Sequence, residues 1–239
     1  MGTDESERGF GVLFEDDSVL VANKPTGVAT QAPPGIDSLE VRIRRYLAPD
    51  AEGSLYLGIP HRLDRPVSGA IVFAKTRRAA RQLSKQLERR TVGKRYWACV
   101  ERVVEPLEGT WTDYLHKVYG QPRAMVVEGT HPGGQEAVLS YRTLGFHTAG
   151  SWLEIELQTG RTHQIRIQAG SRQHPVLGDE LYGSRVTFGT PTSDERQRPI
   201  ALHARTLEFM HPTTRERILI AAPTPPTWDE LGLNEHTPA

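Results

Sequence analysis

The first half of the chain alternates short apolar runs with polar turns, a pattern typical of strands and amphipathic helices. Leu39, Ile43 and Leu47 recur at four-residue spacing behind Ser38, a residue type that caps helices. Thr76 is a similar cap for a helix with an apolar face and an arginine-rich face. We expect strands at 12–15 and 19–23 joined as a hairpin, a helix from Leu39, a buried strand at 69–74, a helix at 77–90 and a strand at 94–101.

The second half is richer in strands than the first. We expect strands at 123–128, 137–146, 152–158, 202–209 and 217–221, the last two as a hairpin, with a helix at 162–172 and an exposed loop at 184–199. Strands grouped in antiparallel runs with a few helices indicate an α+β fold rather than a doubly wound sheet. We predict one domain over residues 11–222, a flexible leader at 1–10 and a Pro-rich tail at 223–239.

Length and composition place the chain among globular proteins. Its 239 residues suit one large domain, and no apolar run exceeds about six residues, which excludes a membrane span. The first residues are polar and acidic, and this argues against a secretion signal. Cys99 is the single cysteine, so the chain forms no internal disulfide or cysteine-based zinc site. We therefore expect a cytoplasmic protein.

The charges balance over the whole chain but not locally. Lysine and arginine total 29, as do aspartate and glutamate. Residues 61–100, however, hold eleven basic and two acidic residues, and residues 160–175 hold three arginines and no carboxylate. This asymmetry indicates one positive face for a polyanion, although a solvated, arginine-rich helix fits it equally well.

Motifs for bound cofactors are absent from the sequence. It contains no phosphate-binding loop, dinucleotide fingerprint, His-Glu-x-x-His, Cys-x-x-Cys or Gly-x-Ser-x-Gly. Kinases, dinucleotide-dependent oxidoreductases, zinc proteases and α/β-hydrolases are therefore disfavoured. We expect any chemistry to use side chains alone, with no cofactor and no metal.

Two segments combine charge with turn residues. In the first, residues 61–69, Asp64 lies between Arg62 and Arg65, whose charges favour an ionised carboxylate suited to nucleophilic attack. In the second, residues 160–166, Arg161 and Arg166 lie at a strand-to-helix junction, where free backbone N–H groups bind anions. Taken singly, each segment also fits a structural role, as an Arg–Asp loop contact or as a capped helix. The same holds for His163, Gln164 and Tyr96.

Together these segments resemble the RluA-type family of RNA pseudouridine synthases. Its motifs match, in order, LFEDDSVLVANKPTG (13–27), HRLDRPVSG (61–69), KRYWACV (94–100), GRTHQIR (160–166), HPVLGDELYG (174–183) and LHA (202–204). Two positions depart from the family pattern: Val67, where threonine is common, and Gln168, where histidine is common. We expect Val67 to give its loop no side-chain hydrogen bond and Gln168 to bear on substrate choice.

The resemblance implies a pseudouridine synthase fold: a mixed, mainly antiparallel sheet with a central RNA-binding cleft. It implies Asp64 as the catalytic carboxylate, Tyr96 as the active-site tyrosine and Arg166 as the basic partner of Asp64. Arg62 would fill the gap left by a flipped nucleotide, while substrate contacts are expected from Arg65, Arg161, His163 and Gln164. The partner would be RNA, ribosomal rather than transfer RNA, bound by a monomer without membrane or metal.

Several readings stay open at this level. Asp64 can attack C1′ of the ribose, add to C6 of the uracil, or assist formation of a glycal. A non-catalytic RNA-binding protein using the same cleft, and a hydrolase of N-glycosidic bonds, are the competing functions. The hydrolase needs a second carboxylate, for which Asp179 is the one spare candidate, although Gly178-Asp179-Glu180 is also typical of a turn or helix cap.

Overall fold

The computed structural model describes residues 5–49, 55–121, 123–190 and 192–232. The chain divides into two compact units, which are described in turn. Unit 1 comprises residues 1–94, 194–197 and 204–225, and unit 2 comprises residues 95–193, 198–203 and 226–239.

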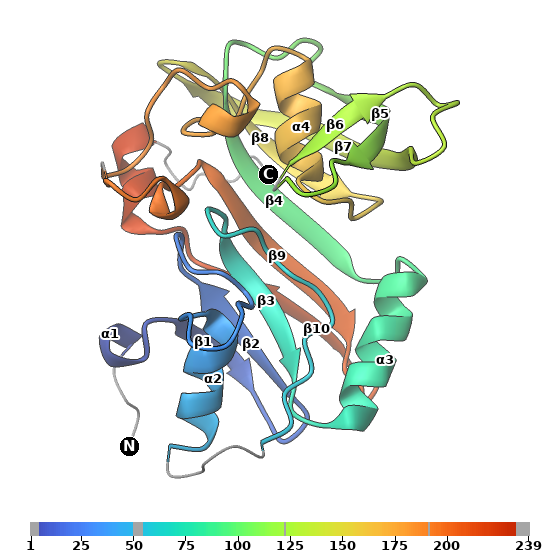
Figure 1. Ribbon diagram of the computed structural model, residues 1–239, viewed down its shortest axis with the longest axis vertical. Coiled ribbons are helices and arrows are strands. Elements are labelled where there is room, and N and C mark those ends of the chain that lie inside the picture. The colour runs from blue at the N-terminus through green and yellow to red at the C-terminus, as the bar shows by residue number, and fades with distance from the viewer. Residues whose placement is uncertain (1–4, 50–54, 122, 191, 233–239) are drawn as a thin grey trace. The chain divides into compact units, whose positions relative to one another are not determined.

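Unit 1 is built on a small sheet. Its elements are α1 (Glu5–Arg8), β1 (Gly11–Glu15), β2 (Val19–Lys24), α2 (Leu39–Leu47), β3 (Ser68–Ala74), α3 (Arg77–Glu88), η2 (Glu195–Gln197), most of β9 (Leu202–Met210) and β10 (Arg217–Ala221) (Figure 1). The strands follow the order β1-β2-β3-β9, and β10 pairs with β9. The β1–β2, β2–β3 and β9–β10 pairs are antiparallel, so both predicted hairpins are confirmed.

Helices α2 and α3 of unit 1 begin where the sequence predicts. The Ser38 side chain accepts a hydrogen bond from Val41 N–H, and the Thr76 side chain accepts one from Ala79 N–H. Helix α3 ends at Glu88 rather than at the predicted residue 90. Its apolar face buries Ala79 and Leu83 against alternate residues of β2, β3 and β9. All seven residues of β3 are buried, as expected for a continuous apolar run.

Unit 2 is an antiparallel sheet with one longer helix. Its elements are most of β4 (Gly93–Glu101), β5 (Glu108–Lys117), β6 (Ala124–Val127), β7 (Gln135–His147), β8 (Gly150–Leu157), α4 (Gln164–Ser171), η1 (Glu180–Tyr182) and η3 (Pro226–Leu231). The strand order is β4-β8-β7-β5-β6, with antiparallel neighbours throughout. Ile167 of α4 packs against Leu115, Ala124 and Ala137, which places α4 over β5, β6 and β7.

Strand β5 is absent from our sequence prediction. Its covered positions include Trp111 and Leu115, which would have formed a clear alternating pattern. Asp113 lies between them on the same face, because side chains two residues apart in a strand share a face, and its carboxylate pairs with Arg172. The alternating apolar pattern of β5 is interrupted because the charged Asp113 occupies a position on its buried face.

The two ends of the chain are partly structured. Among the leader residues that are described, Glu5–Arg8 form a helical turn and Phe10 is buried, while residues 1–4 lie outside the described part. Within the tail, η3 buries Trp228 in T-shaped contact with Phe188 and His203, and residues 233–239 lie outside the described part. The extents of the leader and tail stay predictions. No helix within the described ranges is long and apolar enough to cross a bilayer.

Candidate active site

The Asp64 loop of unit 1 is held mainly through its backbone. Val67 N–H donates to the Asp64 carbonyl at 3.1 Å, which closes a turn. Thr30 pairs with both backbone groups of Leu63, donating through Oγ1 to the carbonyl at 2.9 Å and accepting from the N–H at 3.1 Å. Thr26 Oγ1 donates to the Pro66 carbonyl at 2.9 Å. The loop therefore needs no hydroxyl at position 67, and this agrees with the buried Val67 found there.

Lys24 fastens this loop to the end of β2. Its side chain is fully buried, and Nζ donates to the carbonyls of Pro25 at 2.9 Å, Val28 at 2.7 Å and Arg65 at 3.1 Å. Gly27 N–H also donates to the Arg65 carbonyl, at 2.9 Å. The Lys-Pro-Thr-Gly turn thus supplies a buried clamp for the segment that carries Asp64.

Burial lowers the pKa of two basic residues of the Asp64 region, Lys24 and His61. Desolvation lowers the pKa of Lys24 to about 7, against the attraction of the Asp64 carboxylate, which raises it. Desolvation, with a smaller contribution from Lys94, lowers the pKa of His61 to about 3. The Nε2 atom of His61 accepts a hydrogen bond from Val72 N–H at 3.2 Å, as a neutral imidazole can. His61 is therefore a structural partner of β3.

Arg166, in α4 of unit 2, forms a buried ion pair that the sequence did not reveal. Its Nε and Nη2 donate to the two carboxylate oxygens of Asp179 at 2.7 and 2.8 Å. The two side chains are only 7% and 1% exposed, and the Arg166 guanidinium also lies 5.1 Å from the centre of the Tyr182 ring. Such a two-point contact fixes the plane of the guanidinium.

The prediction of a turn or helix cap at Asp179 is confirmed for its backbone. The residue does precede η1, but its side chain makes no capping hydrogen bond. Its backbone carbonyl accepts from Tyr182 N–H at 3.0 Å, so a turn is present there. The carboxylate points at Arg166 instead, because a buried guanidinium needs a counter-charge.

His163 begins α4 in a left-handed conformation, with φ of 55°. Its Nδ1 lies 2.8 Å from the Tyr182 hydroxyl, which also accepts a hydrogen bond from Ala124 N–H at 3.0 Å. The tyrosine hydroxyl can accept from Ala124 N–H and also share a hydrogen bond with His163 Nδ1, in which either group can be the donor. Tyr182 therefore supports both His163 and Arg166, a role that sequence reasoning did not assign.

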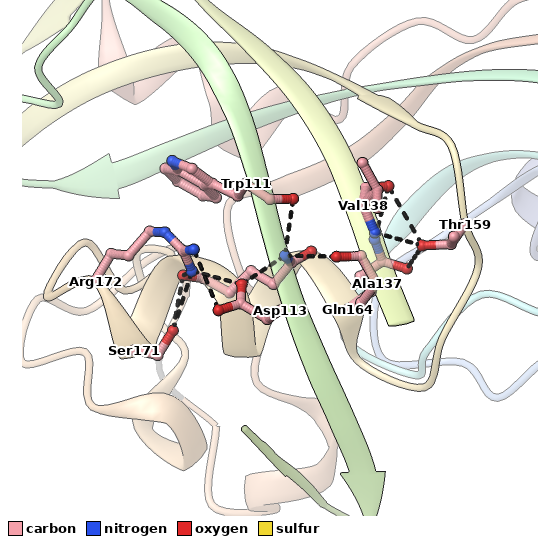
Figure 2. A network of polar contacts seen from close by, with 9 residues as sticks. Trp111, Asp113, Ala137, Val138, Thr159, Gln164, Ser171 and Arg172 are labelled. Carbon is pink, nitrogen blue, oxygen red and sulfur yellow. Dashed lines mark hydrogen bonds and ion pairs between the residues drawn. The ribbon is translucent and has the colours of Figure 1, made fainter. Parts of the chain in front are cut away.

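Gln164 and Arg161 brace the turn before α4. The Gln164 side-chain oxygen accepts from Thr159 Oγ1 at 2.8 Å and from Arg161 N–H at 3.0 Å, while its Nε2 donates to the Val138 carbonyl at 3.1 Å. Arg161 Nε donates to the Glu136 carbonyl of β7 at 2.8 Å. Figure 2 shows Gln164 beside Thr159 and Val138. Arg161 and Gln164 thus have a structural role, and their contacts with substrate stay predictions.

Gln168 has a structural role inside unit 2, and its expected bearing on substrate choice stays a prediction. Gln168 is fully buried, and its Nε2 donates to Asp113 Oδ2 at 2.7 Å and to the carbonyls of Trp111 and Ala137 at 3.2 Å each. Asp113 also accepts from Arg172 Nη1 at 2.7 Å, a contact visible in Figure 2. Gln168 thus joins α4 to β5 and β7 from inside unit 2.

The remaining predicted residues are placed simply. Tyr96 lies in β4, 7% exposed, at the register position opposite Ile155 of β8. In unit 1, Arg62 is exposed, and Asp64 and Arg65 are partly buried. Unit 1 thus carries the predicted carboxylate with Arg62 and Arg65, and unit 2 carries Tyr96 and the 160–166 segment.

Comparisons with known proteins agree with the sequence motifs. A family model described as RNA pseudouridylate synthase matches residues 18–171, which include parts of both units. An uncharacterized RNA pseudouridine synthase of Synechocystis sp. is 35% identical over 224 residues, covering 92% of this chain and 67% of that protein. The ribosomal large subunit pseudouridine synthase D of Xanthomonas campestris is 35% identical over 223 residues, covering 90% of this chain and 66% of that protein. The chain thus spans about two thirds of each relative's length.

Solved structures support the fold. Human RNA pseudouridylate synthase domain containing 4 superposes with a TM-score of 0.74 at 23% identity, over 94% of both chains. Human RNA pseudouridylate synthase domain containing 1 gives a TM-score of 0.70 at 24% identity, over 94% of this chain and 87% of that one. Both confirm the predicted α+β fold. With a matching family model and relatives above 30% identity over nearly its whole length, the chain belongs to the RluA-type family of RNA pseudouridine synthases, isomerases that convert uridine in RNA to pseudouridine.

Proposed function

We propose that this enzyme isomerises uridine in ribosomal RNA, with Asp64 as the catalytic carboxylate, Tyr96 as the active-site tyrosine and Arg166 as the basic partner of Asp64. The substrate class rests on one observation: relatives from Xanthomonas campestris, Vibrio cholerae and Neisseria meningitidis, 32–35% identical, are named ribosomal large subunit pseudouridine synthases. Transfer RNA is the alternative class.

The reaction needs no redox change and no net group transfer. The N1–C1′ bond breaks, the uracil turns, C5 bonds to C1′, and the proton on C5 leaves while N1 gains one. A stacked uridine is first extruded at a cost of a few kcal/mol. Contacts with phosphates offset that cost, and Arg62 fills the gap that the base leaves.

Asp64 is supported as the reacting group by its setting. Its loop is clamped through the backbone carbonyls of Leu63, Pro66 and Arg65, which fixes the segment that carries the carboxylate. The carboxylate can attack C1′, add to C6 or assist glycal formation, and each route uses an ionised aspartate. Tyr96 stacks on the uracil and relays a proton. Asp179 takes two of the five N–H donors of Arg166 and so orients the guanidinium that is proposed as the basic partner of Asp64.

Tritium release tests the function directly. The enzyme is incubated with a transcript of large-subunit ribosomal RNA that carries 5-tritiated uridine, and tritium in water is counted. We expect release by the native enzyme and a loss on the order of 1,000-fold in Asp64→Asn. Asp17→Asn is the matched control, because Asp17 is an exposed carboxylate in the turn between β1 and β2, and it should turn over normally. Normal turnover by Asp64→Asn would reject the assignment.

Further arms separate the alternatives. Tyr96→Phe should fold and turn over much more slowly, and a native rate would reject its proton relay. Tritium release from transfer RNA but not from ribosomal RNA would overturn the substrate class. Free uracil among the products would indicate glycosidic hydrolysis in place of isomerisation.

A further inference from the structure

A groove of about 410 Å³ runs beside α3 in unit 1. Its walls are formed by Tyr56 and, from α3, by Arg77, Ala80, Arg81, Ser84, Lys85 and Glu88. Figure 1 shows α3 as a separate helix following β3. The volume lies within the range of pockets that hold small ligands. None of these residues belongs to the segments assigned to catalysis.

The wall formed by Tyr56 is firmly placed. Gly58 pairs with Ala74 of β3 through two backbone hydrogen bonds, at 2.8 and 2.9 Å. A Cβ added to Gly58 would lie 2.8 Å from the Ala80 side chain and 2.9 Å from the Tyr56 hydroxyl, so this segment lies tightly on α3. The Arg77 guanidinium stands 4.8 Å from the centre of the Tyr56 ring. The groove therefore has a preformed aromatic side.

The helix that forms the other wall is also anchored. Ala79 and Leu83 are buried in the core of unit 1. Gln86 makes two hydrogen bonds of 2.8 Å with the backbone of Met210, donating to its carbonyl and accepting from its N–H. The basic side chains of α3 thus extend from a fixed helix into solvent.

The cations in the groove form a regular row, and one carboxylate, that of Glu88, also lines the groove. Arg77, Arg81 and Lys85 follow one another at four-residue spacing, about 6 Å apart along the helix axis. All three are exposed, and none has an ion pair within the described residues. Like charges at this spacing repel and destabilise a helix. The repulsion is relieved when a polyanion binds, and successive phosphates of one nucleic-acid strand have a similar separation.

We propose that this groove binds the phosphodiester backbone of the RNA substrate, as a contact site outside the catalytic residues. Arg77, Arg81 and Lys85 contact successive phosphates of one strand, and Tyr56 contacts a sugar or base of the same strand. The proposal rests on the proposed function, because it takes RNA, the substrate of the enzyme, as the molecule that occupies the groove. It assigns binding to one stripe of α3 rather than to the whole basic region 61–100.

Two triple variants of the full chain test whether Arg77, Arg81 and Lys85 bind RNA. Arg77→Gln/Arg81→Gln/Lys85→Gln removes the groove cations. Arg78→Gln/Arg89→Gln/Arg90→Gln removes three exposed cations that do not line the groove, from α3 and the residues just after it. Binding of a fluorescein-labelled 12-nucleotide oligouridylate is measured by anisotropy over a range of salt concentrations, and circular dichroism checks folding.

The two variants should differ clearly. In the groove variant, we expect the Kd to rise at least tenfold and the slope of log K against log salt to fall by about 2, at roughly 0.7 per lost phosphate contact. In the control variant, the Kd should change less than threefold with the slope unchanged. Equal weakening in both would overturn the groove in favour of a diffuse basic face, and unchanged binding in the groove variant would overturn it outright.

Variants of Tyr56 and competition by a second polyanion are two independent tests of the groove. Tyr56→Ala should weaken oligouridylate binding about tenfold, while Tyr56→Phe retains it, since the ring rather than the hydroxyl makes the contact. Native binding by Tyr56→Ala would contradict the aromatic contact. Polyglutamate at equal ionic strength should not displace the oligouridylate, and efficient displacement would assign the groove to acidic polypeptides instead.

Turnover separates this proposal from the proposed function. At saturating ribosomal RNA the groove variant should keep its kcat within twofold of the native enzyme and show a raised KM. If the native enzyme releases no tritium, the proposed function fails, while oligouridylate binding still reports on the groove. A kcat that falls in parallel with binding would overturn the separation of the groove from catalysis.

Discussion

The Asp64 loop of unit 1 and the 160–172 segment of unit 2 are positioned by different means. The Asp64 loop is held by hydrogen bonds to its backbone carbonyls, donated by Lys24, Thr26 and Thr30. The 160–172 segment is held by its own side chains, through the Arg166–Asp179 ion pair and the amides of Gln164 and Gln168. A backbone clamp accepts many side chains on the loop, whereas a side-chain network depends on each member.

This difference explains the two departures from the family pattern. Val67 replaces the common threonine on a loop whose contacts are made by its backbone, so no partner is lost. Gln168 replaces the common histidine at a fully buried position, and its amide donates to Asp113 and two carbonyls. We expect the first substitution to be neutral because of the clamp, and the second to be tolerated because an amide also donates hydrogen bonds.

The largest stability effect is expected at the buried ion pair. Asp179→Asn leaves Arg166 without its counter-charge, and we expect a loss of about 3 kcal/mol in the free energy of unfolding. Urea denaturation measures it. The matched control is Glu154→Gln, whose partner Arg142 is 50% exposed, and its loss should stay below about 1 kcal/mol. Equal losses in the two variants would show that burial of the pair does not matter.

Lys24→Met should have an intermediate effect, with a characteristic pH dependence. Three carbonyls lose a donor, and we expect a loss of about 2 kcal/mol near pH 7. The pKa of Lys24 is about 7 when folded and 10.5 in its ordinary state, so between these values the unfolded chain binds the extra proton. The stability of the native protein should therefore rise with pH in this window, by at most about 1.4 kcal/mol per pH unit.

The variant lacks this titration, so the stability gap between the two proteins should widen from pH 7 to pH 10. Urea denaturation at several pH values measures the gap. A gap that stays constant over this range would show that Lys24 keeps its charge when folded, and the clamp would then be an ammonium group throughout.

The smallest effect is expected for Val67→Thr. The backbone clamp is unchanged, so kcat for tritium release should stay within twofold of native, with a change in stability of about 1 kcal/mol from burying the hydroxyl. A large gain in kcat would show that the loop lacks a side-chain contact that the clamp does not replace. Thermal denaturation and tritium release provide the two measurements.

Local patterns predicted most of the elements. The hairpins, the capped helices and the buried β3 follow from apolar spacing and from Ser38 and Thr76, because these signals act over a few neighbouring residues. Strand β5 was missed because Asp113 interrupts its alternation, and its partner Arg172 is distant in sequence. The family motifs indicated the segments that carry Asp64, Tyr96 and Arg166. They did not indicate Asp179 or Tyr182 as supports of Arg166.

The sequence by itself determined the family, the α+β class and the two charged segments, since ordered motifs and hydrophobic periodicity are properties of the chain. Only the tertiary structure decided which buried polar groups pair with one another: Asp179 with Arg166, Gln168 with Asp113, and Lys24 with three carbonyls. The physical reason is desolvation. A polar group removed from water must find a partner wherever folding brings one, and that partner has no fixed distance along the chain.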